Sequence, residues 1–197
     1  MTEILDKRVL KTRSAIKRAF VDLLMDLSYD KISVSQIAEG AFINRNTFYL
    51  HYTDKDDLLD QLTKECLNRL RQSMHVDVFQ IKHGESPEDL LHQVAKQTFE
   101  SIEKDLDFYK AVLHDDNIPY LFVKIHNVIR DHFIEVSSSP EHLIYIEFIS
   151  SGILGLIRYW IMHPHQFTAE KLADAMVHIQ KNSMRDLLLN LSHTTTI

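Results

Sequence analysis

Apolar residues recur three and four positions apart along most of the chain, which is the spacing of amphipathic helices. The first stripe, which includes Ile16, Phe20 and Leu24, predicts a helix over residues 7–27. The pattern breaks at residues 28–30. The chain is therefore expected to begin with one long helix whose apolar face packs on the rest of the molecule.

Two short helices and a longer one are predicted next. Ser33 can cap a helix that ends near Gly40, and Asn44 can cap a third helix over residues 45–51. Thr53-Asp54 then caps a fourth helix. Residues 75–87 lose the helical period and are predicted as a connector. Further helices are expected over residues 87–104, 106–114, 119–136, 140–163 and 168–191. The predicted fold class is all-α, with about nine helices.

Composition supports long helices and excludes some chemistry. Four Gly and four Pro in 197 residues are few, so loops should be short. The glycine spacing cannot build a Gly-rich phosphate loop. Twelve histidines include no pair with metal-ligand spacing, and no acid/base or Ser-His-Asp constellation stands out. We therefore expect no metal, no cofactor and no catalytic residues; a helical enzyme is an alternative without support.

The one cysteine points to a reducing compartment. Cys66 cannot form an internal disulfide, and it is expected to be a packed thiol on the fourth helix rather than a redox sensor.

No signal peptide is visible at the start of the chain. The most apolar stretch, residues 148–162, is interrupted by Arg158 and looks too short for a bilayer. The expected location is the cytoplasm, without a membrane partner.

A long helix followed by two short ones is the spacing of a helix-turn-helix motif. Its second short helix enters the major groove of DNA, so its outer side must be polar. Phe48 and Tyr52, four residues apart, can face the core. Polar side chains then remain free to point outward, namely Arg45, Asn46, Thr47, Tyr49 and His51. Arg can pair with guanine and Asn with adenine, which predicts double-stranded DNA as a partner.

The segment from about Thr12 to Leu62 resembles the TetR family of transcriptional regulators. The resemblance is carried by the run Ile32-Ser33-Val34-Ser35-Gln36-Ile37-Ala38, then Ile43-Asn44-Arg45-Asn46-Thr47-Phe48-Tyr49-Leu50-His51-Tyr52, then Asp54-Lys55-Asp56-Asp57-Leu58. It implies a homodimer on a palindromic operator, usually released by a small effector. It also implies a helix-turn-helix DNA-binding domain over residues 1–54 and a helical ligand-binding and dimerisation domain over 55–197.

The resemblance implies DNA contacts from specific residues. Arg45, Asn46 and Thr47 would meet bases or the nearby backbone, and the others would meet phosphate or support the helix. The full set is Ser33, Ser35, Asn44, Arg45, Asn46, Thr47, Tyr49, His51 and Lys55. One departure is that Phe42 stands where the family often has a turn glycine. We expect Phe42 to pack on the first helix.

Net charge by itself argues against nucleic acid, but its distribution does not. The total is −6, whereas residues 1–52 carry a net +2 and residues 53–197 a net −8. Six cations fall between residues 7 and 18. They are expected to meet phosphate, although a solvated helix face explains some of them.

The later helices are expected to form the dimer interface and a ligand pocket. The resemblance places the interface on residues 140–163 and 168–191, where Ser151, Gly152 and Gly155 allow close helix approach. Arg158 is expected to pair across the interface with Glu147 or Asp174, or else to meet an anionic ligand. Candidate pocket residues, for each of which a role in core packing is the favoured alternative, are Phe99, Phe108, Tyr109, Phe122, His126, Phe148 and Trp160.

Residues 148–160 are similar to the C-terminal domain of TetR-family members linked to dihydroxyacetone kinase regulation. That similarity keeps a second hypothesis open, in which a partner protein replaces the small effector. The main prediction is a TetR-like regulator, a repressor that acts as a homodimer.

Overall fold

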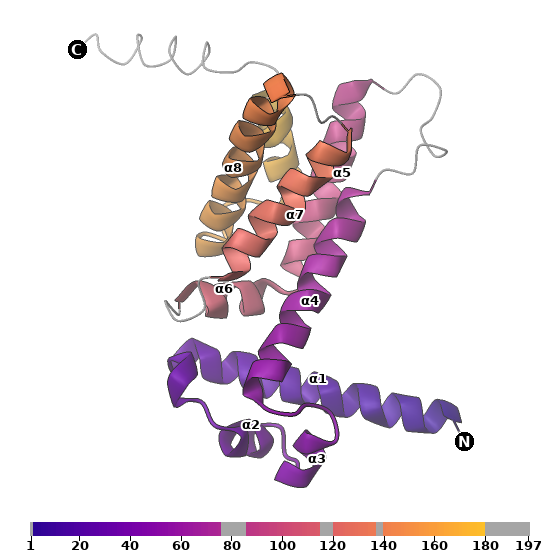
Figure 1. Ribbon diagram of the computed structural model, residues 1–197, viewed down its shortest axis with the longest axis vertical. Helices are drawn as coiled ribbons and strands as arrows, with labels where there is room; N and C mark the ends of the chain where they lie inside the picture. Colours follow the sequence, from indigo (N-terminus) through magenta and orange to yellow (C-terminus); the bar gives the residue numbers. More distant parts are fainter. Residues whose placement is uncertain (1, 76–85, 115–119, 137–139, 180–197) are drawn as a thin grey trace, which may run out of the picture. The chain divides into compact units, whose positions relative to one another are not determined.

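The computed structural model describes residues 2–75, 86–114, 120–136 and 140–179. Over these residues it contains helices and no strands, which confirms the all-α prediction. The helices, labelled in Figure 1, are α1 (Thr2–Asp26), the 3-10 helix η1 (Tyr29–Lys31), α2 (Val34–Gly40), α3 (Arg45–Tyr49), α4 (Lys55–Met74), α5 (Pro87–Glu103), α6 (Leu106–His114), α7 (Tyr120–Val136) and α8 (Pro140–Met162). A further helix covers residues 169–179.

Most predicted helix bounds agree with the structure to within two residues. The largest difference is at α1, which begins five residues before the predicted start. The last predicted helix, 168–191, is described only as far as residue 179, and its remainder lies outside the described residues. The predicted connector likewise falls mostly outside them.

Contacts divide the chain into two compact units. The first contains residues 1–68 and 105–128, and the second contains residues 69–104 and 129–197. Helices α4 and α7 each contribute to both units. The predicted functional boundary at residue 54 stays a prediction.

The first unit is built around α1. The predicted stripe is buried, with Ile16 and Phe20 fully covered and Leu24 3% exposed. Helix α2 lies close to α1 at Gly40. A Cβ placed on Gly40 would lie only 3.1 Å from the Cβ of Ala19. Helix α6 also packs on α1. The long helix is thus the base on which the two short helices are held.

The turn between α2 and α3 corrects one expectation. Phe42 does not pack on α1: its side chain is 97% exposed. Its φ angle is 55°, and among the described non-glycine residues it alone has a positive φ. The turn therefore keeps the left-handed geometry that glycine usually supplies, and that geometry turns the aromatic ring outward.

The second unit has an aromatic centre. Trp160 of α8 is 1% exposed and meets Phe99 of α5 edge to face, with ring centroids 5.6 Å apart. The indole Nε1 donates to the carbonyl of Phe167 at 3.0 Å, which satisfies its buried polar group. Leu172 and Ala173 of the last described helix are buried in the same unit.

Helix α8 is apolar on two sides, and one of them is exposed. Ile157 and Trp160 are buried, whereas Ile144 is 74% and Phe148 76% exposed. The apolar part of the helix starts before residue 148, so it is longer than the stretch on which the expectation of a segment too short for a bilayer was based. Residues 142–162 are long and apolar enough to cross a membrane by length and composition alone. One such helix is weak evidence, since core helices of other proteins pass the same test.

Candidate nucleic-acid interface and an apolar cavity

Helix α3 is a short helix fixed by its cap and by one aromatic residue. The side chain of Asn44 accepts a hydrogen bond from the backbone N–H of Asn46 at 2.9 Å, as an N-cap residue should. Phe48 is fully buried and Tyr52 is 2% exposed, which confirms that both face the core. Arg45 and Asn46 are exposed, Thr47 is half-buried, and Tyr49 is 48% exposed. The helix therefore presents polar side chains on the side away from the core.

Helix α2 begins with a capping box. The backbone N–H of Gln36 donates to the Ser33 hydroxyl, and the Ser33 N–H donates to Oε1 of Gln36 at 2.9 Å. The cap fixes the direction in which α2 starts. Ser35, on the first turn, is exposed. The two serines thus lie at the helix N-terminus, where backbone N–H groups favour an anion.

The predicted phosphate ligand Lys55 is engaged within the first unit. Its Nζ donates to the carbonyls of Tyr29 at 2.9 Å and Ile32 at 3.1 Å, and lies 4.4 Å from the centre of the Tyr29 ring. The Tyr29 hydroxyl in turn donates to Asp56, and burial together with this bond raises the pKa of Tyr29. These bonds tie the start of α4 to η1. His51 is half-buried beside Tyr52.

Two of the six cations near the start of the chain also have internal roles. Arg13 donates to Gln61 at 2.9 Å and to Glu65 at 3.3 Å, and its guanidinium lies 5.2 Å from the Tyr52 ring centre. Lys17 pairs with the buried Asp105 at 2.5 Å. They hold α1 to α4 and to the start of α6, so the expectation that this whole basic stretch meets phosphate was too broad. Other cations of the stretch, Arg8, Lys11 and Arg18, are exposed.

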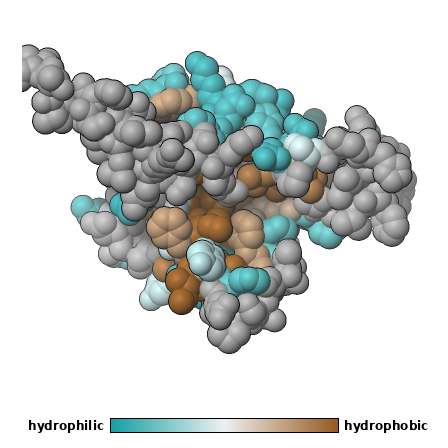
Figure 2. Space-filling model, turned by 90° about the horizontal axis from the view of Figure 1, so that it is seen from above, coloured by the Kyte–Doolittle hydropathy of each residue, from teal (hydrophilic) through white to brown (hydrophobic). Residues whose placement is uncertain are grey.

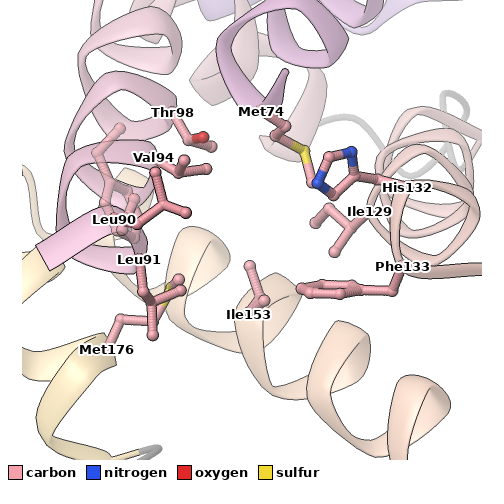
Figure 3. Close-up of a pocket in the computed structure, with 12 residues that line it drawn as sticks. Met74, Leu90, Leu91, Val94, Thr98, Ile129, His132, Phe133, Ile153 and Met176 are labelled. Atoms are coloured by element: carbon pink, nitrogen blue, oxygen red, sulfur yellow. The ribbon is translucent and has the colours of Figure 1, made fainter. Parts of the chain in front are cut away.

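The second unit contains a cavity of about 210 Å³. Helices α5 and α7 form two of its walls, and Figure 3 shows their side chains facing each other across it. The apolar lining residues are Met74, Leu90, Leu91, Val94, Ala95, Phe99, Ile129, Phe133, Ile153 and Met176. Thr98 and His132 are the two polar residues of the lining. This is an apolar site with very few hydrogen-bonding groups.

The predicted pocket residues are distributed over both units. Phe99 lines the cavity. Trp160 packs against the Phe99 ring and is not among the lining residues. Phe148 is exposed on α8. The remaining four belong to the first unit, in which Phe108 and Tyr109 are buried and Phe122 and His126 are half-buried. Their ligand role stays a prediction. Thr98 and His132 line the cavity but belong to no sequence motif and are not aromatic anchors, so the sequence pattern did not identify them.

Cys66 is 1% exposed, which confirms a packed thiol. Arg158 is exposed, and Asp174, one of its expected partners, bonds His92 at 3.0 Å within the chain, so the Arg158 pair across the interface stays a prediction. Among the described residues, no group of three or more His, Cys, Asp or Glu side chains could hold a metal ion.

Family profiles match both parts of the chain. The profile described as "Bacterial regulatory proteins, tetR family" matches residues 18–62, and the one described as "Transcriptional regulator C-terminal region" matches residues 89–182. The first match covers α2 and α3 with their caps. The second covers most of the helices that line the cavity.

Curated relatives are also regulators. An uncharacterised HTH-type transcriptional regulator of Bacillus subtilis, YxbF, is 24% identical over 178 residues, covering 85% of this chain and 45% of its own length. DhaS of Lactococcus lactis, an activator of the dhaKLM operon, is 40% identical over 53 residues, covering 27% of this chain and 28% of its own. The chain thus spans less than half the length of these relatives.

Solved structures share the fold. The dihydroxyacetone kinase operon activator DhaS has a TM-score of 0.58 at 18% identity, with 89% of this chain and 97% of that chain covered. The regulator FadR of Bacillus subtilis, solved with stearoyl-CoA, has a TM-score of 0.61 at 19% identity, with 84% and 96% covered. Because the profiles account for both parts of the sequence and the helices agree with them, the chain belongs to the TetR family of transcriptional regulators.

Proposed function

We propose that the chain is a DNA-binding transcriptional regulator that recognises a palindromic operator as a homodimer. The single observation that carries this proposal is the exposed polar surface of α3, capped by Asn44 and anchored by the buried Phe48. A short helix of this kind fits the major groove. We propose no catalytic activity, because family relatives are regulators.

The residues divide into two kinds of contact. Arg45 and Asn46 are exposed at the start of α3, so they supply base contacts, with Thr47 beside them. Phosphate contacts come from Ser33, Ser35, Tyr49 and His51, whereas Lys55, whose Nζ bonds the carbonyls of Tyr29 and Ile32, holds the start of α4 in place beside them. Phosphate contacts position a protein on DNA, and base contacts specify the sequence. The local net charge of +2 on residues 1–52 is consistent with this division.

A gel-shift assay against the promoter region beside the protein's own gene tests the proposal. Arg45→Ala and Asn46→Ala should each weaken the free energy of DNA binding by about 1–3 kcal/mol and relax the preference for one DNA sequence over others. Tyr49→Phe should weaken binding equally for all sequences. Arg130→Ala is the control, because Arg130 lies on α7 and bonds Asp131. Unchanged affinity and preference in Arg45→Ala would contradict the recognition assignment.

The homodimer would form through α8 and the segment 168–191. Large apolar side chains are exposed along α8, including Ile144 and Phe148 near its start and Met162 at its end. Gly152 and Gly155 lie between them, and a Cβ on either would meet no atom within 4 Å. Hydrophobic residues also gather on the face shown in Figure 2. Exposed apolar patches of this kind mark interfaces between proteins.

Sedimentation at micromolar concentration tests the interface. Phe148→Asp places a charge on the proposed contact and should give a monomer. Val123→Asp is the matched control, because Val123 is 57% exposed on α7, outside the proposed interface. A wild-type monomer, or an unchanged dimer in Phe148→Asp, would rule out this interface.

We further propose that the protein is a cytoplasmic repressor released by a small effector. The cavity between α5 and α7 supports an effector site. The relative DhaS is named an activator of the dhaKLM operon, so activation is the second candidate for the sign of regulation. A partner protein in place of the small effector is the second candidate for what controls the regulator. A reporter behind the promoter distinguishes the two signs: deletion of the gene should raise expression for a repressor and lower it for an activator.

A further inference from the structure

A buried hydroxyl group without a partner lies in the wall of the cavity. Thr98 is 7% exposed, and its Oγ1 has no hydrogen-bond partner among the described residues. A threonine within a helix often donates to the carbonyl four residues earlier, here that of Val94. The hydroxyl does not make that bond, and Figure 3 shows its oxygen turned toward the space between α5 and α7. A polar group of a ligand would complete this site.

The rest of the lining restricts the charge of such a ligand. No Asp, Glu, Lys or Arg is among the lining residues. His132, on α7, is the other polar residue, and its ring lies across the cavity from Thr98 (Figure 3). A carboxylate or phosphate placed among these apolar walls would lose its hydration and meet no Lys or Arg, with the His132 ring as its one potential partner in the lining. The lining therefore favours a neutral molecule.

The volume restricts the size. An engineered cavity of about 150 Å³ with Leu, Ile and Phe walls stays dry and binds benzene. The cavity beside Thr98, at about 210 Å³, has less than one and a half times the volume of that engineered cavity. In proportion, it accommodates about eight to ten non-hydrogen atoms.

We infer that this cavity binds a compact, neutral, mostly apolar molecule through one hydroxyl or carbonyl group that bonds Oγ1 of Thr98. A threonine hydroxyl both donates and accepts, so it serves either group. Thr98 is then a specificity-determining residue: it selects molecules with one polar group over equally large hydrocarbons. The inference rests on the proposed function, in which the bound molecule is the effector.

The test uses two probes of equal size on the full chain. Benzyl alcohol and ethylbenzene each have eight non-hydrogen atoms and differ in a hydroxyl against a methyl group. Isothermal titration calorimetry gives both dissociation constants for the wild type and for Thr98→Val, which removes the hydroxyl at nearly constant shape. The variant should weaken benzyl alcohol relative to ethylbenzene by about fivefold, the equivalent of one net hydrogen bond.

Two control variants isolate the hydroxyl. Thr98→Ser keeps the hydroxyl and should keep the wild-type ratio of the two constants. Thr63→Val removes a buried threonine hydroxyl from α4 in the first unit, outside the lining, and should also leave the ratio unchanged. Because Thr98→Val deletes an unsatisfied polar group, its thermal midpoint should equal or exceed that of the wild type, so the variant remains folded.

Three results would overturn the inference: an equal ratio in wild type and Thr98→Val, no binding of either probe, or displacement of benzyl alcohol by a tighter-binding stearoyl-CoA. Gel shifts on the same preparations separate this inference from the proposed function. If the protein binds its promoter but the ratio does not change, the inference alone fails. If the ratio changes but no DNA is bound, the proposed function alone fails.

Discussion

Replacing Phe42 with glycine is expected to stabilise the protein. Phe42 holds a φ of 55°, and the left-handed region costs a residue with a Cβ about 1–2 kcal/mol. Glycine adopts this region freely but loses about 0.5–1 kcal/mol more backbone entropy on folding. The ring is 97% exposed, so its removal forfeits almost no burial. The net expectation is a gain of about 0.5–1 kcal/mol in the free energy of unfolding.

Urea unfolding followed by far-UV circular dichroism measures this gain. All variants are compared at one protein concentration, because dimerisation would otherwise change apparent stability. Phe42→Ala removes the ring but keeps the Cβ, so it should stay within about 0.5 kcal/mol of the wild type. Phe42→Gly should exceed Phe42→Ala by about 1 kcal/mol, or about 2–4 °C in thermal midpoint for a chain of this size.

Leu50 provides the matched control within the same motif. It is 81% exposed, and its φ is −74°. At a negative φ the strain is absent, so Leu50→Gly should be less stable than Leu50→Ala by about 0.5–1 kcal/mol. The difference in free energy of unfolding between the glycine variant and the alanine variant must therefore have opposite signs at positions 42 and 50. The same sign at both, or a loss above about 1 kcal/mol in Phe42→Ala, would refute the reasoning.

Three further predictions concern contacts within the units. Lys17→Ala leaves the buried carboxylate of Asp105 without its 2.5 Å partner, and should lower the free energy of unfolding by about 1–3 kcal/mol in a urea titration. Ser33→Ala removes the α2 cap and should lower the free energy of unfolding by about 1 kcal/mol in the same assay without DNA. An unchanged free energy of unfolding would show that the cap does not stabilise the protein. Hydrogen bonds, chiefly from Gln61, hold the pKa of Asp57 below its ordinary value. The Asp57 carboxylate therefore makes its full contribution to the free energy of unfolding above the unfolded pKa of about 3.9, and this contribution is lost as the pH falls through the pKa of the folded state. Stability measured from pH 6 to 2 should decline less steeply in Asp57→Asn, and identical slopes would contradict this assignment.

The sequence by itself determined where most of the described helices begin and end. Ser33 and Asn44 cap α2 and α3 as predicted, and Ser86 with Pro87 starts α5 through the same kind of local signal. These features depend on hydrogen bonds between residues two to four positions apart, which neighbouring residue types fix. The family motif around α3 is equally local, so it could be recognised without a structure.

Only the tertiary structure decided which side chains meet across the chain. Arg13 and Lys17 looked like part of a basic face, but their partners Glu65 and Asp105 lie 52 and 88 positions away. Helical periodicity shows that a residue is on an apolar face and does not show which helix covers that face. Phe148 is therefore exposed although its sequence environment is apolar. The cavity beside Thr98 is the space that five packed helices leave unfilled, and unfilled space depends on how all the side chains fit together rather than on any single segment.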